Sequence, residues 1–218
     1  MHNENESNMI SPNFASDKID LANYNDLVDI FEDRMRHWIL EPALKLLKTT
    51  HGYVPAIALV LGYFEGIEIY LSGKDSINSS KVFFRNGFKR VFNVEESGSS
   101  FYGKIIDALY VQIRCGFAHD GLFRNRVFFS SSRPDALYIT WPKKDGKYIT
   151  DGQLESVVVN PKRFIECIFL HFEAYLEDLR GGRNDELKAN FLAAVKMKWG
   201  IDEPERIIGV ARDEFFRR

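Results

Sequence analysis

The sequence predicts a mainly α-helical protein: a helical bundle that carries a small antiparallel β insertion and two extra helices at its carboxyl end. From about residue 23, apolar residues recur every three or four positions, the spacing that gathers them on one face of an α-helix. Between about residues 124 and 160 the period changes to two, and short segments rich in Val, Ile, Phe and Tyr alternate with turn sequences. Two further amphipathic segments follow residue 183.

The composition, with 45% hydrophobic and 28% charged residues, is that of an ordinary globular protein. A net charge of −2 argues against a dedicated non-specific nucleic-acid binder, which is usually basic overall. Cys115 and Cys167 lie in apolar helical stretches without the spacing of metal ligands, which favours a reduced intracellular protein. The longest apolar run, residues 56–64, is too short to span a bilayer, and the polar amino terminus does not resemble a signal peptide. We therefore expect a cytoplasmic protein that does not enter a membrane.

Composition divides the chain into three regions. Residues 1–22 are rich in Asn, Ser, Glu and Asp, and we expect a flexible tail there. Residues 23–182 form the predicted bundle, with the β insertion at about 124–160. Residues 183–218 are expected to be a helical extension that caps the bundle or contacts a partner.

Each helix is predicted from a stripe of apolar residues, and some have signals at their ends. The helix over about 101–118 is central, because its stripe should lie against the core and Gly121 can close its end in the left-handed conformation. This stripe consists of Ile106, Tyr110, Ile113 and Phe117. The other predicted helices span about 26–47, 53–71, 75–94, 160–180, 184–199 and 203–216.

The β insertion is predicted from four short segments separated by turn residues. Asp145-Gly146, flanked by lysines, is typical of a hairpin turn, because glycine adopts the positive φ that such turns need. We expect one small antiparallel sheet, which is too small to be an independent domain. The predicted strands are residues 126–129, 136–141, 147–150 and 156–159.

An arginine and a histidine, Arg114 and His119, lie at the end of the central helix. The guanidinium can bind a phosphate and the imidazole can transfer a proton, so the pair could hold and cleave a phosphodiester. The spacing alone is a weak signal, because an arginine and a histidine five residues apart arise readily by chance. A solvated arginine and a histidine that caps the helix dipole is the structural alternative.

Two acids, Glu65 and Glu68, share a face of the apolar helix over 53–71. A carboxylate on a buried helix needs a partner, because an unpaired buried charge costs several kcal/mol. We expect Arg114 to be that partner. The alternative is that both acids face solvent at the end of the helix.

Three cations, Lys81, Arg85 and Lys89, recur every four residues on one face of the helix over 75–94. Such a stripe is usually a solvated helix face, but it also offers a path for a phosphate backbone. We include these residues and Arg124 as candidate RNA contacts.

Several common catalytic patterns are missing from the sequence. It contains no glycine-rich phosphate loop, no Cys/His zinc pattern, no Gly-x-Ser-x-Gly and no His-Glu-x-x-His. We therefore expect no metal and no cofactor, and Arg114 and His119 are left as the plausible chemical pair.

The segment Arg114-Cys115-Gly116-Phe117-Ala118-His119 resembles the Arg-x4-6-His motif of the HEPN superfamily, helical-bundle proteins that include prokaryotic ribonucleases and toxins. Residues 63–68, Tyr-Phe-Glu-Gly-Ile-Glu, occupy the preceding helix, where related proteins often carry an acid. The resemblance covers about residues 25–180, with the strands as an insertion before the last bundle helix.

The resemblance implies metal-independent RNA cleavage in which the ribose 2′-hydroxyl attacks the adjacent phosphate. His119 would be the general acid or base, and Arg114 would bind the phosphoryl oxygens as charge develops. Glu65 or Glu68 would orient Arg114, and we include Asp120 as a further supporting residue. The resemblance also implies a homodimer that places two Arg114–His119 pairs across its axis, within a defence or toxin-antitoxin system.

A second class of function stays open: a non-catalytic HEPN-like bundle that binds RNA, an antitoxin or another protein partner. Active members of the family usually have a polar residue directly after the arginine, and this chain has Cys115 there. The acidic pI also favours this alternative.

Overall fold

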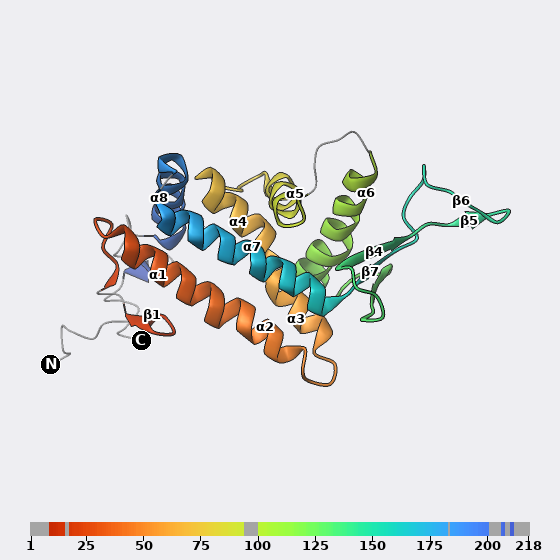
Figure 1. The fold of residues 1–218 in the computed structure, drawn as a ribbon, viewed down its shortest axis with the longest axis horizontal. Helices are drawn as coiled ribbons and strands as arrows, with labels where there is room; N and C mark the ends of the chain where they lie inside the picture. The colour runs from red at the N-terminus through yellow and green to blue at the C-terminus, as the bar shows by residue number, and fades with distance from the viewer. Residues whose placement is uncertain are drawn as a thin grey trace.

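The computed structural model describes residues 9–15, 18–93, 100–182 and 184–200, without the side chains of residues 100 and 101, and the backbone of 206–207 and 210–211. The described part is mainly helical, as the sequence predicts, and its strands belong to separate small sheets (Figure 1). The core combines aliphatic and aromatic side chains, and Phe64, Phe84, Phe164 and Phe172 are among its largest fully buried members.

The first long helix consists of α1 (Tyr24–Arg34), a segment of wider turns (Met35–Leu40) and α2 (Glu41–Leu46). The Asn23 side chain caps it by accepting a hydrogen bond from the backbone of Asp26. Pro42 lies in the first turn of α2, just after the wide turns. Because proline has no N–H and its ring crowds the preceding turn, a local change to i→i+5 hydrogen bonds lets the helix continue past it.

Helices α3 (Tyr53–Val60) and α4 (Gly62–Ser72) follow one another closely and lie in the core. The 20 residues from Tyr53 to Ser72 are long and apolar enough to cross a membrane by length and composition, but half of the apolar stretch is buried inside the protein, as in a core helix. Helix α5 (Ser80–Val91) packs tightly on α4 at Gly87, where a Cβ atom would lie 1.8 Å from the backbone oxygen of Phe64. Glycine is therefore required at this crossing.

The start of α5 differs from the prediction. The helix begins at Ser80, although the sequence predicts a start at about Asp75. The Ser76 hydroxyl donates a hydrogen bond to Glu65, so it serves a tertiary contact rather than the helix end.

The central helix is formed by α6 (Ser100–Leu109) and the wide-turn segment η3 (Tyr110–Asp120), and Gly121 ends it at φ 72° as predicted. Ile106 and Ile113 are fully buried, as predicted. Phe117 is 40% exposed, so the prediction that it lies against the core is wrong. Residues four apart share a face at 3.6 residues per turn, and i→i+5 bonding widens the turn and moves Phe117 away from that face.

The β insertion lies between the central helix and α7, as predicted, but its pairing is mixed. Strands β3 (Val127–Phe129), β7 (Ser156–Val159) and β4 (Leu137–Thr140) form a sheet in the order β3-β7-β4. β3 is parallel to β7 and β4 is antiparallel to it, so the prediction of one antiparallel sheet is wrong. Parallel pairing needs a long connection, and the chain between β3 and β7 supplies it.

The other two strands of the insertion, β5 (Lys143–Lys144) and β6 (Lys147–Tyr148), form a separate hairpin that projects from the sheet (Figure 1). Asp145 and Gly146 have φ values of 51° and 78°, as a two-residue hairpin turn requires. The hairpin turn was therefore predicted correctly, although the predicted strand over 147–150 is shorter.

Helices α7 (Pro161–Gly181) and α8 (Asp185–Trp199) complete the helical part. Asn160 and Asn184 cap them, each accepting a backbone N–H from three residues later. α7 runs beside α1 and covers α3 and α4 (Figure 1).

Both ends of the described chain depart from the predictions. Within the predicted flexible tail, β1 (Met9–Ser11) and β2 (Phe14–Ala15) pair as a hairpin that packs on α1. Asp33 fixes this hairpin by accepting hydrogen bonds from the backbone and the side chain of Asn13. The acid that holds the hairpin lies 20 residues downstream, so the local composition of the tail did not reveal it.

Within the predicted helix over 203–216, β8 (Arg206–Ile207) and β9 (Val210–Ala211) pair as antiparallel strands. The helix prediction is therefore wrong at these four residues, where β-branched side chains favour a strand. The rest of that segment lies outside the described residues.

Candidate functional site

The predicted partnership between an acid of α4 and Arg114 is present, and the acid is Glu65. Arg114 Nη2 donates a hydrogen bond to Glu65 Oε2 at 3.0 Å. The Arg114 side chain is 30% exposed and that of Glu65 is 17% exposed. Glu65 therefore anchors the guanidinium from the protein side, while part of the arginine stays accessible to solvent.

Hydroxyl groups complete the environment of Glu65. Ser76 Oγ donates to Oε1 at 2.8 Å and Ser80 Oγ donates to Oε2 at 2.7 Å. Tyr110, one turn before Arg114, donates to Ser80 Oγ at 3.2 Å. The network joins α4, α5 and η3, so Arg114 is oriented by three elements of the fold.

Burial by itself raises the pKa of Glu65, but hydrogen bonds from Ser80 and Ser76 and the charge of Arg114 outweigh it. The pKa of this carboxyl therefore lies below its ordinary value. At neutral pH Glu65 is an anion, which is the form that binds a guanidinium.

Glu68 does not hold Arg114, so of the two predicted alternatives it is Glu65 that the structure supports. Its carboxylate accepts a hydrogen bond from Arg90 Nε at 2.6 Å and one from Asn86 Nδ2 at 3.3 Å. Both partners come from α5, which packs along α4. Glu65 and Glu68 are one turn apart, but Glu65 binds an arginine of η3 and Glu68 binds an arginine of α5.

His119 is exposed at the end of the central helix, in the last turn before Gly121. In an α-helix, residues five apart point about 140° away from one another, because each residue turns the chain by about 100°. In η3, where i→i+5 hydrogen bonds close the turns, residues five apart are separated by about one turn. The wide-turn geometry therefore brings Arg114 and His119 toward the same side of the helix.

The chain returns over the helix end immediately after Gly121. A Cβ atom on Gly116 would lie 2.8 Å from the backbone oxygen of Leu122, so glycine permits this close approach. The backbone N–H of Arg124 donates to the Gln112 carbonyl at 2.9 Å and fastens the returning segment. Cys115, next to Arg114, is half-buried.

Asp120 and Arg124 pair with one another. Arg124 Nε lies 2.6 Å from Asp120 Oδ2, and both side chains are largely exposed. The hydrogen bond from Arg124 lowers the pKa of Asp120, and the charge of His119 lowers it further. Asp120 thus adds negative charge beside His119, while Arg124, a predicted RNA contact, is engaged by Asp120.

The predicted stripe of cations on α5 faces α6. Lys81 Nζ and Arg85 Nε lie 3.3 and 3.4 Å from Asp107 Oδ1. That oxygen accepts no hydrogen bond of good geometry, so we regard these contacts as charge pairs in partly exposed surroundings. Lys89 is half-buried. The stripe is therefore partly neutralised by the neighbouring helix.

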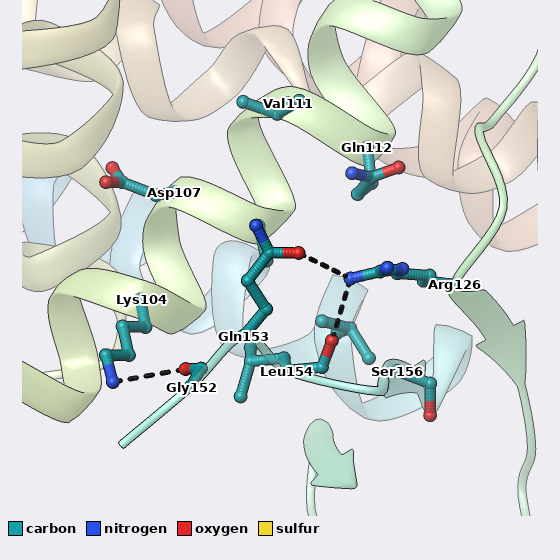
Figure 2. Close-up of a pocket in the computed structure, with 11 residues that line it drawn as sticks. Lys104, Asp107, Val111, Gln112, Arg126, Gly152, Gln153, Leu154 and Ser156 are labelled. Carbon is teal, nitrogen blue, oxygen red and sulfur yellow. Dashed lines mark hydrogen bonds between the residues drawn. The ribbon is translucent and has the colours of Figure 1, made fainter. Parts of the chain in front are cut away.

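A pocket of about 380 Å³ lies between the central helix and the segment that leads into β7 (Figure 2). Lys104 reaches from α6 to the carbonyl oxygens of residues 150–152, with its shortest contact, 2.7 Å, to Asp151. Arg126 Nη1 donates to Gln153 Oε1 at 3.2 Å and to the Leu154 carbonyl at 3.1 Å. Lys104 therefore fastens the insertion to the central helix, and Arg126 joins two segments of the insertion to one another.

A second cluster, which the sequence does not predict, surrounds His171 on α7. Tyr63 OH and His171 Nδ1 are hydrogen-bonded at 2.9 Å. Burial raises the pKa of Tyr63 well above its ordinary value. Burial, and then the charge of Arg90, lower the pKa of His171. Its position one turn from Ile168 and Tyr175 in the apolar stripe of α7 was the available signal.

Among the residues that the structure describes, no three His, Cys, Asp or Glu side chains gather in a way that could hold a metal ion.

No family model matches this sequence, and comparisons with curated proteins and with solved structures found no significant similarity. The resemblance to HEPN proteins therefore rests on the Arg114–His119 motif and the acid at Glu65, and function is argued from the site.

Proposed function

We propose that the protein is a HEPN-like helical bundle that cleaves RNA without a metal ion, as a ribonuclease or toxin of a prokaryotic defence or toxin-antitoxin system. One observation carries the proposal. Arg114 is held by the buried carboxylate of Glu65, one wide turn of η3 away from the exposed imidazole of His119. An anchored guanidinium beside an accessible base is the minimal equipment for phosphodiester cleavage of this kind.

In the proposed reaction, His119 accepts the proton of a ribose 2′-hydroxyl. The 2′-oxygen forms a bond to the adjacent phosphorus while the bond from phosphorus to the 5′-oxygen breaks, and the leaving oxygen is protonated. The products are a 2′,3′-cyclic phosphate and a 5′-hydroxyl. Arg114 has five N–H donors, and with Nη2 on Glu65 the group is oriented to bind the phosphoryl oxygens.

A homodimer fits this chemistry, because a cleavage that needs both an acid and a base gains from a second His119 across a two-fold axis. We propose this assembly, in the cytoplasm and without a membrane contact. Light scattering at micromolar concentration tests it: a monomer that cleaves RNA at the full rate would contradict the dimer.

The second candidate is a non-catalytic bundle that binds RNA or a protein such as an antitoxin. The observation that favours it is the neutralisation of Arg114 by Glu65, together with the half-buried Cys115 at the position where active family members carry a polar residue. Binding without turnover would be the expected behaviour of such a protein.

Cleavage of a labelled RNA by the purified protein, with and without EDTA, separates the two candidates. The proposal predicts equal rates in both conditions and fragments that end in a 2′,3′-cyclic phosphate. Rates that collapse in EDTA, or fragments with a 5′-phosphate, would contradict it. Stable RNA binding without cleavage would favour the non-catalytic candidate.

A further inference from the structure

We propose that the outer face of the β insertion binds a segment of single-stranded RNA, with bases stacked on its aromatic rings and phosphates bound by its cations. The proposal rests on the proposed function only for the choice of RNA as the ligand. The residues that form this face are different from those of the Arg114–His119 site.

The alternation of side chains along the strands builds the face. Phe128 of β3 and Tyr138 of β4 both pair with Val158 of β7, so the three side chains form one row across the sheet. The next positions along β7, Val157 and Val159, are buried. The row therefore points away from the core, and Phe128 is 57% exposed although phenylalanine is usually buried.

A hollow of about 750 Å³ opens on this face and is lined by both the sheet and the β5–β6 hairpin. Tyr138 lines it from β4 and Tyr148 from β6, and Tyr148 is 61% exposed. Each ring has a cation over it: Arg133 Cζ is 5.1 Å from the Tyr138 centroid, and Lys143 Nζ is 4.5 Å from the Tyr148 centroid. Rings for bases thus lie beside cations for phosphates, the combination found in single-strand binding grooves.

The charge of the insertion supports the same ligand. Residues 124–160 contain six Lys and Arg and four Asp and Glu, a formal charge of +2 in a chain whose net charge is −2. Positive charge gathered in one region of an acidic protein attracts a phosphate backbone locally.

The spacing of the rings favours a single strand over a duplex. Phe128 and Tyr138 are two strands apart, roughly 10 Å, since neighbouring strands lie about 4.8 Å apart. Bases inside a duplex stay stacked and cannot reach separate rings, whereas the bases of a single strand can be splayed onto them.

Fluorescence anisotropy with a labelled 12-nucleotide oligouridylate tests the proposal, using the full-length chain with His119→Asn so that cleavage does not alter the probe. We expect the double variant Phe128→Ala/Tyr148→Ala to bind at least about tenfold more weakly, because stacking on a ring contributes roughly a factor of ten per base. The matched control is Leu170→Ala, which removes a side chain that is 70% exposed on α7. This control should bind as tightly as its parent.

Three results would overturn the proposal: no binding by the parent at low salt, unchanged binding by the double variant, or equal affinity for a blunt RNA duplex. Tighter binding of oligothymidylate than of oligouridylate would overturn the choice of RNA. The cleavage assay reports separately on the proposed function. If the double variant weakens binding but the wild-type chain does not cleave RNA, the ribonuclease proposal is contradicted and this one is not. If the wild-type chain cleaves RNA but the double variant binds as tightly as its parent, only this proposal is contradicted.

Discussion

The two acids of α4 hold two arginines in different settings. Glu65 binds Arg114 at the end of the central helix, one wide turn from exposed His119. Glu68 binds Arg90 on α5, whose charge acts on the half-buried His171. We call these the Glu65 network and the Glu68 network.

The comparison shows that an arginine–carboxylate pair does not by itself identify a functional site. The Glu68 carboxylate is the more buried of the two, and its network includes the Tyr63–His171 hydrogen bond inside the fold. His119, one wide turn from Arg114 in η3, is exposed, whereas His171 is half-buried. The Glu68 network therefore has the features of a structural cluster, and the Glu65 network those of a site that can meet a substrate.

Removal of each arginine should separate the networks most strongly. Arg114→Ala should lower the rate of RNA cleavage by about 100- to 1000-fold, since it removes a donor aimed at the charge that develops in the transition state. Arg90→Ala is the matched control and should change the rate of the folded protein less than threefold. Rate constants under single-turnover conditions measure the effect of each substitution. Equal losses of rate would show that the two networks do not differ in function.

Removal of the acids should affect stability in both networks but activity in one. Glu65→Gln should lower the free energy of unfolding by about 1–3 kcal/mol, because Arg114 keeps its charge and loses its anion. Urea denaturation measures this loss.

Glu68→Gln should also destabilise the protein, while the folded fraction keeps the wild-type cleavage rate. Glu65→Gln should lower that rate because Arg114 is no longer oriented. Unfolding curves that neither substitution changes would show that these ion pairs contribute nothing measurable.

The two networks should lose stability in different pH windows. The pKa of His171 lies below its ordinary 6.5 in the folded protein, chiefly because of burial, so the unfolded chain takes up a proton more readily. Stability from this group is complete above pH 6.5 and is lost as pH falls from there toward the folded pKa.

For Glu65, the hydrogen bonds and Arg114 outweigh burial and place the folded pKa below the ordinary 4.5. Its contribution is complete above pH 4.5 and is lost as pH falls further. The free energy of unfolding, measured between pH 3 and pH 8, should therefore show two decreases as pH falls, one below 6.5 and one below 4.5. His171→Gln should remove the first decrease and Glu65→Gln the second. The same pH profile in both variants would contradict the assignment.

The smallest effect is expected at Asp120, which pairs with Arg124 on the surface beside His119. Asp120→Asn should leave the thermal midpoint unchanged, because exposed ion pairs contribute little to stability. A clear drop in the midpoint would show that this surface pair belongs to the Glu65 network.

The features that local spacing determines could be predicted from the sequence. The helices follow from apolar periodicity, as at α7 and α8. The Glu65–Arg114 pair was predictable as well, because a carboxylate on a buried helix needs a cation and Arg114 was the one proposed.

Features that depend on packing could not be predicted in the same way. Glu65 and Glu68 share one sequence signal, and only the position of α5 directs Glu68 to Arg90. The parallel pairing of β3 with β7 depends on a long connection, and the exposure of Phe117 depends on wide turns that a 3.6-residue period does not anticipate. His171 was overlooked because a histidine in an apolar stripe usually serves the core.

The central claim is that His119, beside the Arg114 held by Glu65, is the group that transfers the proton. The most direct measurement compares RNA cleavage by His119→Asn and by His51→Asn, which changes another exposed histidine, on a loop whose φ of 65° asparagine tolerates. We predict a loss of about 100-fold or more for His119→Asn and an unchanged rate for His51→Asn. Equal rates for the two variants would contradict the assignment of His119 and the site built around it.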